Sequence, residues 1–177
     1  MPIKNIILDF GGVILNLAIP KTISAFNDLI SSPFEEVYTQ SAQSDLFNKF
    51  DKGQISEDHF FKQLSETIFY EGPRDNLVQA WNAMLLDLPS HRLELLKQLK
   101  LKYATFLLSN TCETHIRAFE EEMNKRHGIE NLNDYFQKVY YSCRIGMRSL
   151  TWQASATAGG TPALSLPNRS TSSGRNS

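Results

Sequence analysis

Residues 6–15 read I-I-L-D-F-G-G-V-I-L, and this stretch decides the fold. The apolar run from Ile6 to Leu8 is typical of a strand buried in a parallel sheet. The run stops at Asp9, and the pair Gly11-Gly12 predicts a tight turn directly after it. In α/β folds, ligands bind in the crevice at the carboxyl ends of such strands. We therefore expect the Asp9 carboxylate to face a ligand crevice.

Asp9 is the first candidate for chemistry. The glycines that follow it allow backbone N–H groups to approach an anion closely. An aspartate in this setting can attack phosphorus and form an aspartyl-phosphate. The alternative interpretation of D-x-G-G is an aspartate that caps a turn at the end of a strand, and in isolation the motif favours that alternative.

The order of the remaining elements predicts an α/β fold with a parallel sheet. Helical periodicity dominates residues 17–88, where Ser56 is expected to be an N-cap and where the apolar pattern continues through Trp81, Leu85 and Leu88. Further elements are expected in alternation: a helix at 91–100, a strand at 103–108, a helix at 113–126 and a strand at 138–143.

A second polar site follows the strand expected at 103–108. Ser109 and Asn110 offer a hydroxyl and an amide at that strand end, next to a helix N-terminus that favours anions. The alternative is an ordinary helix start, because Asn110 with Glu113 three residues later fits a capping box.

Composition and charge exclude several classes of protein. A net charge of −1 over 177 residues gives no reason to expect nucleic acid or an anionic membrane as partner. No apolar run reaches the roughly 18 residues that a membrane helix needs. The apolar run at the N-terminus is interrupted at once by Asp9, so we expect no signal peptide and a cytoplasmic location.

Cysteine and histidine give no metal signal. Cys112 and Cys143 form neither a zinc-like spacing nor a disulfide framework. No two of the four histidines have the spacing of metal ligands, and we expect them to be solvated or packed; they are His59, His91, His115 and His127.

Taken together, the motifs resemble those of the haloacid dehalogenase superfamily. Residues 6–15 resemble its first motif, F-L-L-S-N-T at 106–111 its second, and K-V-Y-Y-S-C-R-I-G-M-R at 138–148 the approach to its third. The sequence F-x-x-x-x-x-G-x-I-S from Phe47 to Ser56 is similar to a signature of the bacterial alpha-D-glucose-1-phosphate phosphatase-like group. The resemblance implies a Rossmann-like core at 1–16 and 89–148, with a C1-type helical cap at 17–88.

The resemblance also implies roles for individual residues. Asp9 would be the nucleophile and a magnesium ligand, and the backbone carbonyl of Gly11 a second ligand. Ser109 would hold the transferring phosphoryl group, with Gly12 and Asn110 beside it. The implied activity is that of a phosphomonoesterase that acts on a small phosphate ester, by this branch a sugar phosphate, with Mg²⁺ as cofactor.

The first departure from the family pattern is Gly11. Many members carry a second aspartate there as general acid and base, a role that contributes about 10²- to 10⁴-fold. Dehalogenase members also lack that aspartate, which keeps 2-haloacid dehalogenation as an alternative function.

The second departure begins after Arg148. The family continues with Lys-Pro and later with acidic magnesium ligands, whereas Ser149-Leu150 stands here and no Asp or Glu follows Asp134. Residues 149–177 contain no Asp, Glu or Lys, and we expect a disordered or non-native tail. One A placed before AGC-CTG-ACN, which encodes Ser-Leu-Thr, yields AAG-CCT-GAC for Lys-Pro-Asp, so a frameshift is our hypothesis. A truncated, non-catalytic pseudoenzyme is the third functional alternative.

Overall fold

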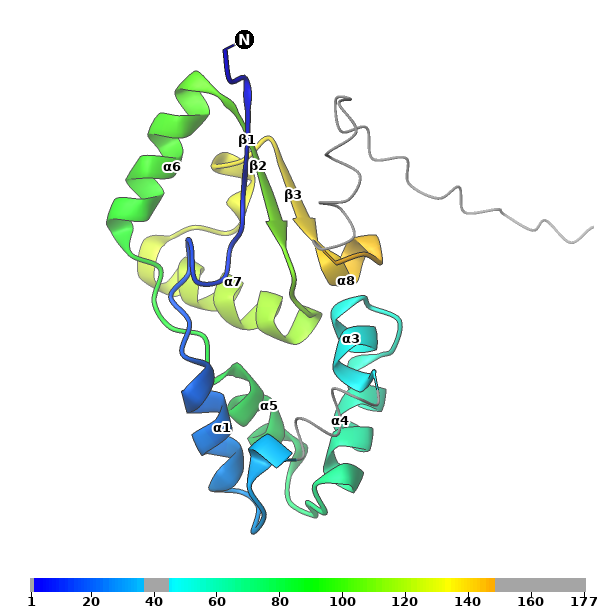
Figure 1. Ribbon diagram of the computed structural model, residues 1–177. Coiled ribbons are helices and arrows are strands. Elements are labelled where there is room, and N and C mark those ends of the chain that lie inside the picture. Colours follow the sequence, from blue (N-terminus) through cyan, green and yellow to red (C-terminus); the bar gives the residue numbers. More distant parts are fainter. Residues whose placement is uncertain (1, 37–44, 149–177) are drawn as a thin grey trace, which may run out of the picture.

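The computed structural model describes residues 2–36 and 45–148, so the expected tail at 149–177 lies outside the described residues. Three parallel strands form a sheet in the order β1-β2-β3 (Figure 1). Their bounds are Asn5–Leu8 for β1, Ala104–Ser109 for β2 and Lys138–Tyr141 for β3. Helices separate the strands along the chain, which confirms the predicted α/β fold with a parallel sheet.

One face of the sheet carries the first hydrophobic cluster. In a parallel sheet, paired residues share a face, and the row Leu8, Leu107 and Val139 lies on the buried one. Two helices pack here: α6 (Ser90–Lys102) through Leu93, and α7 (Glu113–His127) through residues that include Ile116. This cluster anchors the strands whose carboxyl ends carry Asp9 and Ser109.

The residues between β1 and α6 form a helical insert below the sheet in Figure 1. Its described helices include α1 (Ile19–Asn27), α3 (Leu46–Asp51), α4 (Glu57–Thr67) and α5 (Arg74–Asn82). A second hydrophobic cluster, rich in aromatic rings, fills it; its rings belong to Phe26, Phe34, Phe47, Phe50, Phe60, Phe61 and Trp81. The division into a core and a cap at 17–88 stays a prediction, which the two separate clusters support.

A two-stranded ribbon connects the insert to the sheet. Asn16 N donates to Asp87 O over 3.0 Å, Leu86 N donates to Asn16 O over 3.0 Å, and Leu17 and Leu85 form an antiparallel bridge. The apolar pattern predicted a helix through Leu88, and this was wrong. Helix α5 ends at Asn82, because the residues that follow pair with the outgoing chain.

One alternative interpretation and one strand boundary also differ from the structure. Cys112 is the N-cap of α7 and makes no side-chain cap bond, so Asn110 and Glu113 form no capping box. The strand expected to reach Cys143 ends at Tyr141, because the short helix α8 (Ser142–Ile145) begins there. The predicted N-cap of α4 is confirmed, since Ser56 Oγ accepts from His59 N over 3.2 Å.

Among residues 2–36 and 45–148, every helix is too short or too polar to cross a membrane.

Candidate active site

Asp9 and Ser109 lie at the same edge of the sheet. Leu8 pairs with Leu107 across β1 and β2, so Asp9 and Ser109 follow on neighbouring strands with an offset of one residue. Neighbouring strands are about 4.8 Å apart. The structure thus brings together the two residues that the sequence singled out 100 positions apart.

The Asp9 side chain is held at one oxygen. Its Oδ1 accepts a hydrogen bond from Phe10 N over 2.7 Å, and the residue is exposed at the end of β1. The bond fixes the orientation of the carboxylate, and the exposure lets a substrate reach it. Both conditions suit a nucleophile.

The turn after Asp9 wraps around one carbonyl oxygen. Ile14 N and Leu15 N both donate to Phe10 O, over 2.8 and 2.9 Å, and Gly12 N donates to Leu15 O over 2.8 Å. Gly12 has φ +76°, a left-handed conformation that favours glycine. The glycine pair therefore permits the turn that keeps the backbone close to Asp9.

Gly11 faces the connecting ribbon. A Cβ at position 11 would lie 2.7 Å from Leu17 Cδ1, the far end of a flexible side chain. A small movement of the Leu17 side chain would therefore make room for an aspartate at position 11, where many family members carry one.

The loop after β2 is clamped by α8. Ser109 is buried, with 3% of its surface exposed, whereas Asn110 is exposed. Thr111 N donates to Ser142 Oγ over 2.9 Å, and Ser142 Oγ donates to Thr111 O over 3.0 Å. Ser142 thus positions the loop that carries Ser109. This role of Ser142 could not be predicted from the sequence, because residues 138–143 have the pattern of a strand.

A pocket of about 280 Å³ lies between the helical insert and the sheet, and we name it the interface pocket. Most of its walls are apolar, which suits the binding of a small organic group. Its lining residues are Ile19, Thr22, Ile23, Phe34, Phe47, Asp51, Trp81, Met84, Asn110, His115 and Arg148. Asn110 connects the interface pocket to the sheet edge, because it directly follows Ser109.

Two oppositely charged side chains that line the interface pocket form an ion pair. Arg148 of the sheet unit lies 3.5 Å from the Asp51 carboxylate of α3. Burial raises the pKa of Asp51, and the Arg148 charge offsets part of that rise. Because the two charges oppose each other, the pair adds no net charge to the pocket.

The turn at Gly53, between α3 and α4 of the helical insert, contacts α8 close to the ion pair of Arg148 and Asp51. A Cβ at Gly53 would lie 2.1 Å from the Cys143 carbonyl oxygen, and Gly53 has φ +64°. A side chain cannot fit in that space. This contact is a physical reason for the glycine of F-x-x-x-x-x-G-x-I-S at position 53.

His115 is the histidine that faces this pocket. Its ring stacks on Trp81 with centroids 5.3 Å apart and planes 12° apart, and Nε2 lies 3.1 Å from Trp81 O. Burial lowers the pKa of His115 to about 4, and the bond to Trp81 offsets part of that shift. The expectation that this histidine is packed is confirmed. Its place in the pocket could not be predicted, because the Trp81 contact is 34 residues away.

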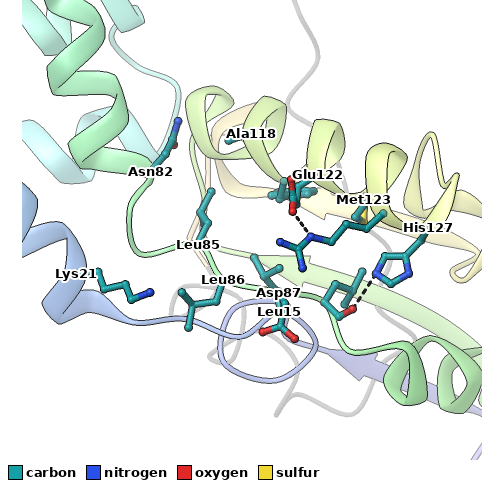
Figure 2. A pocket seen from close by; sticks show the side chains of 13 residues that line it. Leu15, Lys21, Asn82, Leu85, Leu86, Asp87, Ala118, Glu122, Met123 and His127 are labelled. Atoms are coloured by element: carbon teal, nitrogen blue, oxygen red, sulfur yellow. Dashed lines mark hydrogen bonds and ion pairs between the residues drawn. The ribbon is translucent and has the colours of Figure 1, made fainter.

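A larger pocket of about 550 Å³ lies between the connecting ribbon and α7 (Figure 2). Arg126 pairs with Glu122 along its wall, and His127 Nε2 donates to Leu88 O over 3.0 Å. It shares no lining residue with the interface pocket. No residue expected for catalysis lines it.

The described residues do not complete a magnesium site. Within 2–36 and 45–148 no three His, Cys, Asp or Glu residues cluster in a way that could hold a metal ion. Asp9 offers one carboxylate and Gly11 a backbone carbonyl, whereas Mg²⁺ requires near-octahedral oxygen coordination. We therefore assign no chemical step to a metal ion.

The cysteines are not nucleophiles. Burial raises the pKa of Cys112 to about 11 and that of Cys143 to about 12. Both thiols are therefore protonated at neutral pH, and the thiolate is the reactive form.

Comparisons with known proteins agree with the parallel-sheet fold, although no family model matches the chain. Over 144 residues the chain is 30% identical to the D-ribitol-5-phosphate phosphatase of Bacteroides thetaiotaomicron, covering 81% of this chain and 69% of that protein. A HAD family enzyme from the same organism, solved with magnesium and inorganic phosphate, is similar at 29% identity and a TM-score of 0.76, covering 89% of this chain and 80% of that one.

A predicted HAD-like family hydrolase from Porphyromonas gingivalis is also similar, at 26% identity and a TM-score of 0.73. That match covers 90% of this chain and 78% of the other. With the parallel sheet and the motif residues Asp9 and Ser109 at one edge, these similarities show that the chain belongs to the haloacid dehalogenase superfamily.

Proposed function

We propose that this chain is a phosphomonoesterase for a small phosphorylated polyol or sugar, with Asp9 as its nucleophile. The observation that carries the proposal is the placement of Asp9 and Ser109 on neighbouring strand ends. The similarity to a D-ribitol-5-phosphate phosphatase supports the choice of a polyol or sugar phosphate.

The reaction has two steps at phosphorus. An Asp9 carboxylate oxygen attacks the phosphorus atom, the bond to the leaving-group oxygen breaks, and that oxygen takes a proton from water. Water then attacks the phosphorus of the aspartyl-phosphate, which releases inorganic phosphate and restores Asp9. The Ser109 hydroxyl and the Gly11 N–H group hold the phosphoryl oxygens, because the N–H groups of Gly12, Ile14 and Leu15 already donate within the turn.

Turnover is expected to be slow for two reasons. Gly11 has no side chain to protonate the leaving group, a role worth about 10²- to 10⁴-fold. The described residues also form no cluster of three His, Cys, Asp or Glu side chains that could hold a metal ion, so negative charge on the phosphoryl group is poorly balanced. If the leaving group is a weak base, the absence of a general acid slows the attack by Asp9 less than it slows the whole catalytic cycle.

The leaving group is expected to be small and uncharged. Arg148 in the interface pocket is already opposed by Asp51, and among residues 2–36 and 45–148 no other Arg or Lys side chain lines that pocket. A second phosphate group would therefore meet no excess positive charge there. This favours a monophosphate over a bisphosphate.

Dehalogenation of a 2-haloacid remains the second candidate, because Gly11 replaces the acid that phosphatases of the family use. Release of phosphate from D-ribitol 5-phosphate and p-nitrophenyl phosphate should be measured with and without magnesium, beside halide release from 2-chloropropionate. Phosphate release that Asp9→Asn abolishes supports the proposal. Halide release without phosphate release would replace it with dehalogenation. Neither product would favour the non-catalytic alternative.

A further inference from the structure

We propose that His115 selects the substrate by accepting a hydrogen bond from a hydroxyl of the leaving group. The proposal deepens the function proposed above and rests on it. The ring of His115 lines the interface pocket, in the same segment of chain as Asn110 and six residues after Ser109.

The bond to Trp81 fixes which ring nitrogen carries the proton. Nε2 lies 3.1 Å from Trp81 O, and a carbonyl oxygen accepts but never donates, so Nε2 carries the hydrogen. Burial lowers the pKa of His115 to about 4, so the ring is neutral at physiological pH. Nδ1 is therefore left with a lone pair and no proton.

That acceptor has no partner of its own in the structure. Across residues 2–36 and 45–148, the ring of His115 makes no hydrogen bond other than the one to Trp81 O. His115 is only partly buried, and it lines the interface pocket. A ligand in this pocket is therefore the group that can supply a donor.

The position of the acceptor is fixed before a ligand arrives. Trp81 stacks on the ring with planes 12° apart, and its carbonyl oxygen holds Nε2. Two contacts from one residue restrict both tilt and rotation of the imidazole. A preorganised acceptor costs little entropy on binding, which makes its hydrogen bond effective for selectivity.

The surrounding walls sharpen the discrimination. Phe34, Phe47 and Met84 are among the apolar residues that line the interface pocket. An alkyl leaving group would bury Nδ1 without a partner, whereas a hydroxylated one would satisfy it. A site that hydrogen-bonds a substrate hydroxyl rejects the analogue that lacks it, and we expect a preference of about 10-fold here.

Two substitutions separate a role in selectivity from a role in folding. In His115→Gln, the amide NH₂ can still donate to Trp81 O, but no acceptor remains at the place of Nδ1. In His115→Asn, the shorter amide puts its polar atoms near the place of Nδ1 and loses the donor to Trp81. The Gln variant should therefore lose selectivity for the hydroxylated ester. The Asn variant should keep that selectivity but lose the packing contact with Trp81.

Trp81 provides the signal. Substituting Trp152→Phe leaves Trp81 as the one tryptophan, and Asp9→Asn prevents turnover during the titration. In the full 177-residue chain with both changes, the fluorescence of Trp81 is followed as D-ribitol 5-phosphate or n-pentyl phosphate is added. Far-UV circular dichroism checks that each variant is folded.

We expect D-ribitol 5-phosphate to bind about 10-fold more tightly than n-pentyl phosphate. His115→Gln should reduce that ratio to within about 2-fold by weakening the polyol ester alone, and His115→Asn should largely keep it. Equal affinity for the two esters, or equal weakening of both by His115→Gln, would overturn the inference and leave the proposed function standing. If neither ester nor inorganic phosphate binds, the proposed function fails and the inference with it.

A series of ligands tests the same point without a variant. Singly deoxygenated analogues of D-ribitol 5-phosphate should include one position at which the loss of a hydroxyl weakens binding about 10-fold. If every analogue binds as tightly as the parent ester, His115 accepts no substrate hydroxyl and the inference is overturned.

Discussion

The Thr114 hydroxyl of α7 donates a hydrogen bond to the Glu57 carboxylate at the start of α4, over 2.9 Å. Arg117 of α7 pairs with the same carboxylate oxygen, and Arg74 lies 2.7 Å from the other. Burial raises the pKa of Glu57, but these partners outweigh burial and leave the pKa below its ordinary value. Glu57 thus connects the helical insert to the sheet unit on the side of α7.

Replacing Glu57 by Gln should weaken this connection. The variant keeps the shape of the side chain but loses its charge, and we expect unfolding free energy to fall by about 1 kcal/mol because the group is only partly exposed. Affinity for phosphate esters should fall as well, because the interface pocket needs both units in place. Urea unfolding and Trp81 fluorescence measure the two effects.

Glu66→Gln is the matched control, since Glu66 is exposed on the same helix and forms no described ion pair. Equal effects of the two substitutions would contradict a connecting role for Glu57.

The second prediction concerns Gly53 and Gly128, which have nearly equal backbone angles of φ +64° and +65°. Gly128→Ala should cost about 1 kcal/mol, because its new Cβ meets nothing within 4 Å and only the left-handed backbone is strained. Gly53→Ala should cost about 2 kcal/mol more, because its Cβ would meet the Cys143 carbonyl oxygen. Urea unfolding of the two variants gives the comparison, and equal losses would show that the contact between insert and α8 is loose.

The third prediction restores the missing acid. Gly11→Asp should raise the rate of phosphate release at neutral pH by about 10²-fold or more, because a carboxyl group can then protonate the leaving oxygen. The contact with Leu17 Cδ1 involves a flexible side chain and should be relieved by a rotamer change. Gly11→Asn has the same size and no acid, so similar rates for the two variants would refute the explanation given for slow turnover.

The fourth prediction is a pH dependence of stability. Because the pKa of His115 falls from 6.5 to about 4 on folding, the unfolded chain binds more protons between these values. The stability that the neutral ring provides is complete above about pH 6.5 and is lost as the pH falls toward 4, a difference of about 2 kcal/mol after allowance for the accessible part of the ring.

The measurement is the difference in unfolding free energy between the unsubstituted chain and His115→Gln from pH 7 to pH 4.5. Taking the difference cancels the contribution of Asp51, whose raised pKa acts in the opposite direction. His59→Gln, at an exposed position, is the control substitution measured in the same way. A constant difference across this range would show that His115 is not buried as a neutral ring.

The fifth prediction concerns magnesium. Because the described residues form no cluster of three His, Cys, Asp or Glu side chains that could hold a metal ion, magnesium should saturate the phosphatase activity only at concentrations on the order of millimolar or higher. Titration of phosphate release with magnesium chloride, with ionic strength held constant by sodium chloride, tests this. Saturation at micromolar magnesium would reveal further ligands.

The order of elements and the pair Asp9 and Ser109 could be predicted because both are encoded locally. A short apolar run followed by a polar residue reports a buried strand and its end, and parallel strands bring such ends to one edge. The connecting ribbon was missed because Leu85 and Leu88 fit a helical period as well as a paired strand. Pairing with Leu17 decided the outcome, and periodicity carries no information about it.

The supporting residues of the site could not be predicted for a related reason. Ser142 acts through Thr111, 31 residues earlier, and His115 acts through Trp81, 34 residues earlier. Such contacts arise when separate elements pack, so a single sequence shows neither partner. The spacing of Asn110 and Glu113 shows the converse, since it fits a capping box although Cys112 is the N-cap of α7.

The most direct test of the account is the identification of the phosphorylated residue. The 177-residue chain is mixed with D-ribitol 5-phosphate, quenched in acid, digested, and its peptides are analysed by mass spectrometry. The account predicts one phosphoryl group on Asp9, accumulating because Gly11 cannot assist its hydrolysis, and none in Asp9→Asn. Release of inorganic phosphate with no phosphoryl group on Asp9, or undiminished release by Asp9→Asn, would contradict it.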